Sequence, residues 1–153
     1  MMTPQKPMPA EDVESAPFWS ACRAHRLEMQ QCSICRHYQY PPTTFCERCR
    51  STALNWHEVS GFGKLFSWIV VRYGIPREIF GDLVPYAVGL VQLNEGPRIV
   101  TNIVECNVES IFDGMPLEVI FDDVDDGITL PKFRPLKSGP KRPDLRPRSA
   151  ENV

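Results

Sequence analysis

Long apolar segments are missing from this chain of 153 residues. No run approaches the roughly 20 apolar residues that a membrane-spanning helix needs. The first fifteen residues, MMTPQKPMPAEDVES, also lack the apolar core of a secretory signal peptide. We therefore expect a cytoplasmic protein without a membrane span.

Recognisable catalytic motifs are missing as well. The sequence contains no G-x-S-x-G, no G-x-x-x-x-G-K and no G-x-G-x-x-G. Its three histidines, His25, His37 and His57, do not form H-E-x-x-H and do not pair with an evident nucleophile. A stand-alone enzyme is therefore the least favoured of three functional hypotheses, and no catalytic residue is predicted.

Positive charge is scarce in the part of the chain that is expected to fold. Residues 1–131 carry ten Lys/Arg against seventeen Asp/Glu, whereas residues 132–153 carry seven against two. Between Val59 and Phe133 there are five Lys/Arg against eleven Asp/Glu. A groove that follows a phosphate backbone needs an excess of cations, so nucleic-acid binding is only the alternative hypothesis.

Six cysteines are present, and four of them form two C-x-x-C pairs. The pairs are Cys32–Cys35 and Cys46–Cys49, separated by ten residues that include Pro41-Pro42. Four thiolates at this spacing can surround one zinc ion in a closed, structural site, and iron is an alternative metal for the same cage. Disulfides, free thiols and a redox pair are the other interpretations. We expect the two remaining cysteines, Cys22 and Cys106, to be buried small residues.

Composition divides the chain into five segments. Residues 1–16 are expected to be a disordered leader, and residues 17–31 a short helix over about 17–26, with Ser15 as N-cap, followed by a lead-in strand. A cysteine unit follows at 32–55 and a β domain at 56–135. Residues 136–153 are expected to be a flexible basic tail that the fold does not need.

The β domain is rich in β-branched and aromatic residues, with Gly, Pro, Asn and Asp at the joins. Strands are predicted at about 62–73, 85–93, 97–105, 116–124 and 128–134, with a helix or turn at 107–113. Five strands in so short a segment favour a five-stranded OB-fold barrel over a sandwich. The predicted class is therefore mainly β: a short helix, a zinc ribbon and an OB barrel.

Several motifs occur in a fixed order along the chain. They are Phe18-Trp19, the two C-x-x-C pairs around Pro41-Pro42, Gly61-Phe62-Gly63, Pro85-Tyr86-Ala87-Val88, Leu93-Asn94-Glu95-Gly96 and Leu130-Pro131-Lys132-Phe133. In this combination the chain resembles the zinc-ribbon/OB-fold proteins of family thirty-five of the domains of unknown function, over about residues 17–135. One departure is that Arg36 and Arg50 stand where a glycine often follows the second cysteine of each pair. The sequence leaves open whether the backbone there takes the left-handed turn that glycine favours.

The resemblance implies a rubredoxin-like ribbon, an OB barrel and a non-catalytic role beside an acyl-CoA enzyme. Family members assemble with thiolase-like proteins, lipid-transfer-type aldolases or hotdog-fold hydratases, and some help to bind acyl-CoA. We expect the same class of partner here, in a hetero-oligomer. The candidate contacts to a partner or to acyl-CoA are Phe18, Trp19, Arg72, Tyr73, Arg77, Phe80 and Tyr86. Arg23 and Arg26 could add further positive charge near Trp19, and the site would lie in a cleft between subunits.

Overall fold

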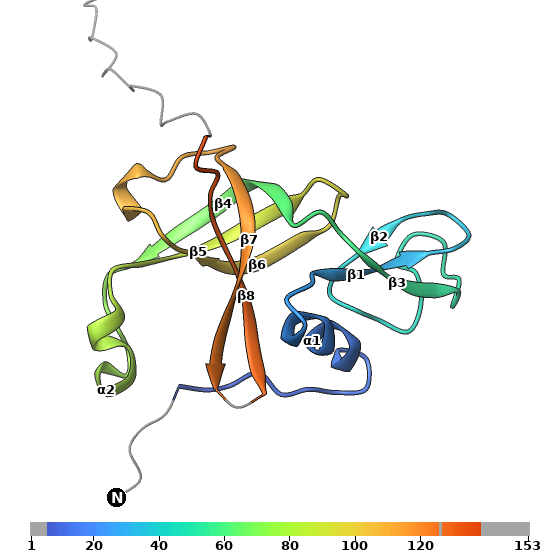
Figure 1. Cartoon of the computed structure of the whole chain (residues 1–153), viewed down its shortest axis with the longest axis horizontal. Coiled ribbons are helices and arrows are strands. Elements are labelled where there is room, and N and C mark those ends of the chain that lie inside the picture. The colour runs from blue at the N-terminus through green and yellow to red at the C-terminus, as the bar shows by residue number, and fades with distance from the viewer. Residues whose placement is uncertain (1–5, 126, 139–153) are drawn as a thin grey trace, which may run out of the picture.

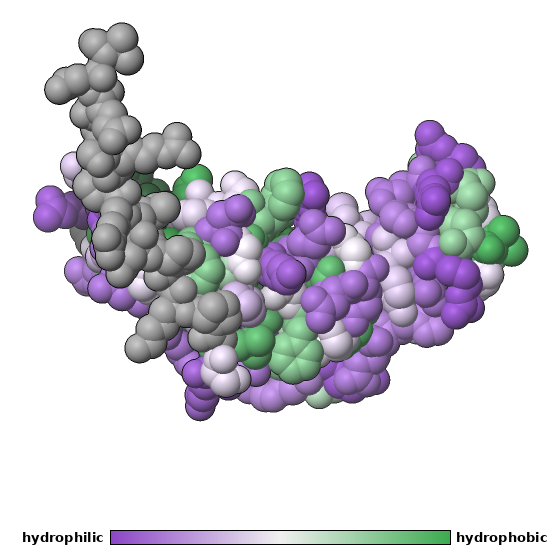
Figure 2. All heavy atoms as spheres, turned by 90° about the horizontal axis from the view of Figure 1, so that it is seen from above, coloured by the Kyte–Doolittle hydropathy of each residue, from purple (hydrophilic) through white to green (hydrophobic). Residues whose placement is uncertain are grey.

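The computed structural model describes residues 6–125 and 127–138, and it consists of a ribbon lobe beside a closed barrel (Figure 1). Seen from above, the ribbon projects from the side of the barrel (Figure 2). The helix α1 (Ala16–Arg23) lies between them and packs against both β1 of the ribbon and β8 of the barrel. No helix in the described part of the chain is long and apolar enough to cross a membrane.

The ribbon is a three-stranded antiparallel sheet with the order β2-β1-β3. Its strands are β1 (Glu28–Cys32), β2 (Tyr38–Gln39) and β3 (Leu54–Glu58). The strand β3 differs from the prediction, which placed the boundary between the cysteine unit and the β domain at residues 55 and 56, inside this strand. Its residues pair with the whole of β1, and an edge strand can carry polar residues because half of its side chains face solvent.

The barrel closes in the order β4-β5-β6-β8-β7, which confirms the predicted OB-fold. Its strands are β4 (Phe62–Val71), β5 (Tyr86–Leu93), β6 (Arg98–Ile103), β7 (Pro116–Asp125) and β8 (Ile128–Pro135). All five lie within two residues of their predicted bounds. The connections hold the short helix α2 (Arg77–Phe80) and the 3-10 turns η1 (Gly81–Leu83) and η2 (Val108–Ser110).

The start of α1 differs from the prediction. Ser15 does not cap the helix with its side chain. Instead, its backbone N–H donates to the carboxylate of Asp12 at 2.7 Å, and the N–H of Asp12 donates to the Ser15 hydroxyl at 3.1 Å. The helix ends at Arg23, earlier than predicted, because the chain turns at His25 with a φ of 55°. Arg23 also forms an ion pair with Glu11, which ties the described part of the predicted leader to α1.

One hydrophobic core connects the barrel, α1 and the ribbon. Phe18 of α1 is 2% exposed, with its ring centroid 5.1 Å from Trp19 and 5.2 Å from Tyr40 of the ribbon. Cys22 on the same helix is buried, and burial raises its pKa to about 12, which leaves an unreactive thiol. Cys106 is only partly buried, in contrast to the prediction. The core therefore fixes the ribbon on the barrel.

Candidate metal centre and partner-contact residues

The four cysteines of the two C-x-x-C pairs converge at one end of the ribbon. Their sulfur atoms all lie within 4.8 Å of one another. The Sγ atoms of Cys32 and Cys49 are 3.5 Å apart, and those of Cys35 and Cys46 are 3.6 Å apart. Each close pair joins the first knuckle to the second, so the cluster belongs to both halves of the ribbon.

The two knuckles have the same backbone geometry. The N–H of Arg36 donates to the carbonyl of Cys32, and the N–H of Arg50 donates to the carbonyl of Cys46, both at 2.9 Å. Arg36 has a φ of 62° and Arg50 a φ of 65°. Both knuckles therefore keep the left-handed turn, although an arginine occupies the position that suits glycine.

Backbone N–H groups prepare part of this cluster for ionisation. The N–H of Cys35 lowers the pKa of Cys32 to about 6, and the N–H of Cys49 lowers the pKa of Cys46. At Cys49 the N–H of Ser51 lowers the pKa, but desolvation together with the three neighbouring cysteine side chains outweighs it and raises the pKa to about 12. Four thiolates this close together cannot all be ionised unless a bound cation neutralises their charge.

The spacing of the sulfur atoms fits a metal ion. A tetrahedral zinc site with Zn–S bonds of about 2.3 Å has edges of about 3.8 Å between sulfurs, near the distances of 3.5 and 3.6 Å found here. A disulfide needs about 2.05 Å between sulfurs, so the present geometry is not that of two disulfides. His37 is not part of the cluster, since its Nε2 lies 2.8 Å from Glu47 Oε1.

A buried pair of glutamines supports the second knuckle, and the sequence reasoning missed it. The Nε2 of Gln39 donates to the oxygens of Gln30, Thr43 and Phe45, and its Oε1 accepts from the N–H of Glu47. Gln30 in turn accepts from the N–H of Thr43 at 2.9 Å. The sequence carries no signal for this pair, because Gln30 stands among other polar residues in β1 (EMQQC) and Gln39 belongs to the two-residue strand β2.

The candidate contact residues are not gathered in one place. Phe18 is a core residue and is not available to a partner, because the chain's own ribbon and barrel cover it. Trp19 is partly buried and packs against that core. In the connection after β4, Tyr73 is 85% exposed and Phe80 is partly buried, and Tyr86 at the start of β5 is also partly buried.

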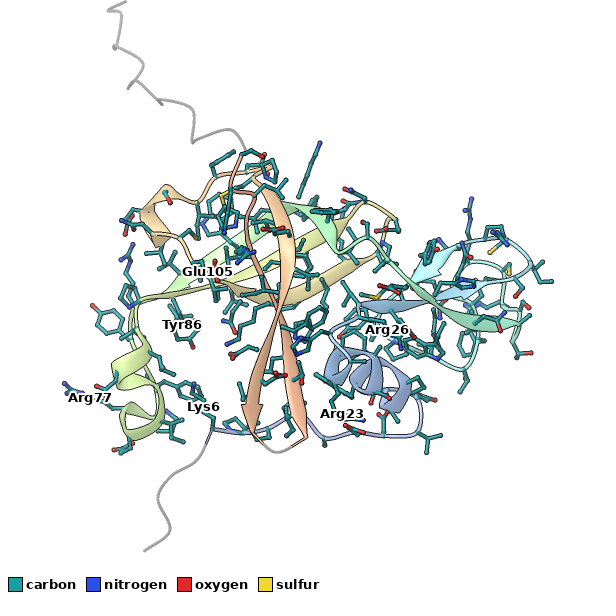
Figure 3. The ribbon with its side chains drawn as sticks, in the orientation of Figure 1. Lys6, Arg23, Arg26, Arg77, Tyr86 and Glu105 are labelled. Carbon is teal, nitrogen blue, oxygen red and sulfur yellow. The ribbon has the colours of Figure 1, made fainter. Side chains whose placement is uncertain are left out.

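The arginines considered for a phosphate site are also separated. Arg77 lies on α2, whereas Arg23 and Arg26 lie beside α1 on the opposite side of the β7–β8 hairpin (Figure 3). Arg23 pairs with Glu11, and Arg26 pairs with Glu28 at 2.7 Å.

Arg72 has a carboxylate partner as well, since it pairs with Glu109. Among the described residues, only Arg77 of the four arginines has no carboxylate partner. The structure therefore does not assemble these arginines into one phosphate site.

Two family models match consecutive parts of the chain. Residues 19–55 match the ChsH2 rubredoxin-like zinc ribbon domain, and residues 56–122 match the ChsH2 C-terminal OB-fold domain. A DUF35 domain-containing scaffold protein of Methanocaldococcus jannaschii is 32% identical over 115 residues, which cover 71% of this chain and 80% of the relative. The chain belongs to the DUF35 family.

Other relatives carry the names of enzyme subunits. A probable enoyl-CoA hydratase alpha subunit of Thermomonospora curvata is 36% identical over 130 residues, which cover 85% of this chain and 40% of that protein. This DUF35 chain thus spans less than half of that relative. A solved structure described as "Ltp2-ChsH2(DUF35) aldolase" superposes with a TM-score of 0.73 at 33% identity and covers 84% of this chain and 98% of the other.

Proposed function

We propose that this DUF35 protein is a non-catalytic, zinc-binding accessory subunit of an acyl-CoA enzyme of the hydratase or aldolase type. The observation that carries the proposal is the match over 98% of the DUF35 chain in the aldolase structure, at 33% identity. The hydratase alpha subunit name of a longer relative supports the same class of partner. Within the described residues, the four-thiolate cluster leaves no open position at which a metal could act on a substrate.

In this proposal the metal has a structural role. Cys32, Cys35, Cys46 and Cys49 hold one zinc ion, which neutralises the crowded thiolates and joins the two knuckles. We also propose that acyl-CoA binds in a cleft shared with the catalytic subunit. The supporting observation is that a small barrel filled by its own side chains has little room for a ligand of that size. The exposed contributors from this chain are Tyr73, Arg77 and Arg72, the last of which pairs with Glu109.

The test is to express the full chain with a cleavable tag in its source organism and to identify co-purifying proteins by mass spectrometry. The expected result is a stoichiometric acyl-CoA hydratase, aldolase or thiolase-like subunit. The purified complex should turn over its acyl-CoA substrate, and the purified chain alone should not. Turnover by the chain alone, or purification without such an enzyme, would contradict the proposal.

A further inference from the structure

The outward side of three barrel strands is apolar. The register places Leu90 of β5 between Ser67 of β4 and Val100 of β6, and the next outward row joins Ile69, Val88 and Asn102. Alternate residues on these strands, such as Val91 and Ile99, point inward and are buried. The outward apolar side chains, here called the β4–β6 face, are Phe66, Ile69, Val88, Leu90 and Val100.

Three of the five side chains of this face are exposed in the isolated chain, and Val88 and Leu90 are partly exposed. Val100 is 67% exposed, Ile69 63% and Phe66 48%. Scattered apolar residues are normal on a protein surface, but these side chains occupy neighbouring rows of one sheet. A contiguous exposed patch of this kind marks an interaction site.

The border of the face is positively charged. The strands β4, β5 and β6 carry Lys64 and Arg98 and contain no Asp or Glu. The guanidinium of Arg98 lies 3.6 Å from the centroid of the Phe66 ring, and its Nε donates to the Oε1 of Gln92 at 3.3 Å. Within residues 6–125 and 127–138, neither Lys64 nor Arg98 has a carboxylate partner. Both cations therefore remain available to a partner's carboxylates, although Asp113 lines the same hollow as Lys64.

A hollow of about 380 Å³ adjoins the end of the face that carries Lys64. Its lining consists of the buried Leu65 and Leu93 together with Lys64, Phe66, Gln92, Asn94, Asp113 and Gly114. A pocket at the edge of an apolar patch can take a single anchoring side chain, which is where interfaces concentrate their binding energy.

We infer that the β4–β6 face binds a protein surface with an apolar centre and an acidic border, and that the catalytic subunit of the proposed complex supplies it. The inference rests on the proposed function for the identity of the partner and on the structure for the location. Complementary charge is the reason for the acidic border, since carboxylates there would pair with Lys64 and Arg98.

Other occupants fit this face less well. A symmetric contact with a second copy would bring cationic borders together without any carboxylate from β4, β5 or β6. The chain's own C-terminal segment is basic and would be repelled. A single-stranded nucleic acid needs free aromatic faces for stacking, whereas the face is mostly aliphatic and Arg98 covers one side of Phe66.

Site-specific photocrosslinking in the source organism tests the location. A photoreactive phenylalanine analogue replaces Val100 in the tagged full chain, and the matched control replaces Val124 of β7, which is 41% exposed. We expect the residue-100 probe to crosslink to an acyl-CoA enzyme subunit, with acidic residues flanking the crosslinked peptide, and the residue-124 probe to give less than a tenth of that yield.

The other crosslinking outcomes separate the two proposals. A residue-100 crosslink to an unrelated protein with an acidic border would support the β4–β6 face as an interface but would overturn the proposed function. Two outcomes would refute the β4–β6 face as the binding surface for the catalytic subunit. One is a crosslink to an acyl-CoA enzyme only from residue 124, and the other is a residue-100 crosslink only to a second copy. Absence of any crosslink to another protein at either position would overturn both.

Matched substitutions test the chemistry in the complex reconstituted from purified subunits. Val100→Asp should weaken binding at least tenfold and Lys64→Glu about threefold or more, whereas Val124→Asp should change affinity less than twofold. Circular dichroism and the thermal midpoint confirm that each variant is folded. The affinity of the wild-type complex should fall with rising salt, and Lys64→Glu should reduce that dependence. Equal affinities for Val100→Asp and Val124→Asp would refute the inference.

Discussion

Replacing the arginine after either second knuckle cysteine by glycine should tighten metal binding. Arg36 and Arg50 have φ values of 62° and 65°, in the left-handed region where a side chain with a Cβ is unfavourable. That conformation costs an L residue about 1–2 kcal/mol. Glycine removes the cost but gains freedom in the unfolded chain, which costs about 0.4–1 kcal/mol. The net gain at each position is therefore about 0.5–1 kcal/mol.

Alanine substitutions supply the control at the same positions. Arg36→Ala removes the charge but keeps the Cβ, so the difference between Arg36→Gly and Arg36→Ala isolates the backbone. At Arg50 both variants also lose the contact of the guanidinium with Phe45, 5.2 Å from the ring centroid, which is a contribution of about 0.5–1 kcal/mol at an exposed site. Arg50→Gly should therefore gain less over the wild type than Arg36→Gly, while the Gly–Ala difference stays the same.

The assay is competition between the protein and a chromophoric chelator for zinc. Folding of a zinc ribbon is coupled to metal binding, so a substitution that stabilises the folded ribbon also makes it bind zinc more tightly. A gain of about 0.7 kcal/mol corresponds to about a threefold lower dissociation constant. Each glycine variant should bind zinc about twofold to fivefold more tightly than its alanine counterpart. Glycine and alanine variants with equal affinity at both positions would refute the reasoning, because the left-handed turn would then carry no cost.

Three further predictions concern other parts of the chain. Elemental analysis should find one zinc per chain, and Cys46→Ser should lose the metal and the ribbon's protection in hydrogen exchange; metal retention in the variant would argue against a four-cysteine site. Phe18→Ala should lower the free energy of unfolding by about 3–5 kcal/mol in urea, because it empties the junction with Tyr40, and a loss below about 1 kcal/mol would contradict that packing. The Thr129 hydroxyl, followed by His25, lowers the pKa of Asp123, so its stabilising effect is present above the ordinary value of 3.8 and is lost as the pH falls through the lowered pKa. Asp123→Asn should therefore reduce the thermal midpoint near pH 6 and not near pH 2; an equal reduction at both would exclude the ionised carboxylate as the cause.

The sequence was most informative where a local pattern strongly favours one structure over its alternatives. Two C-x-x-C pairs ten residues apart predict a ribbon because four thiolates need a common cation. The barrel strands were readable because Gly, Pro, Asn and Asp break the chain between runs of β-branched residues. The turn at Asn94–Gly96, with a φ of 118° at Gly96, is such a break between β5 and β6.

Positions that depend on distant residues were not readable. Phe18 was considered a partner contact because a short helix cannot show which of its sides meets the rest of its own chain. Leu54–Glu58 was divided between the cysteine unit and the β domain, because its polar residues show no strand pattern and its partner β1 lies far away in the sequence. Arg72 looked free in the sequence, but the fold brings Glu109 to it from 37 residues away.

The β4–β6 face explains why alternation was weak in the barrel sequence. An OB strand with one solvated side should alternate between apolar and polar residues, yet FGKLFSWIVV and YAVGLVQL are nearly continuous apolar runs. Such runs are typical of strands buried on both sides, and in this chain the second side has no cover among the described residues. The metal centre lies in the ribbon and the apolar face on the barrel, so the two proposals concern separate parts of the molecule. The barrel has a closed core and a second apolar layer on the outside of three strands, so we interpret this layer as one half of an interface. Phe18 fixes the ribbon beside it.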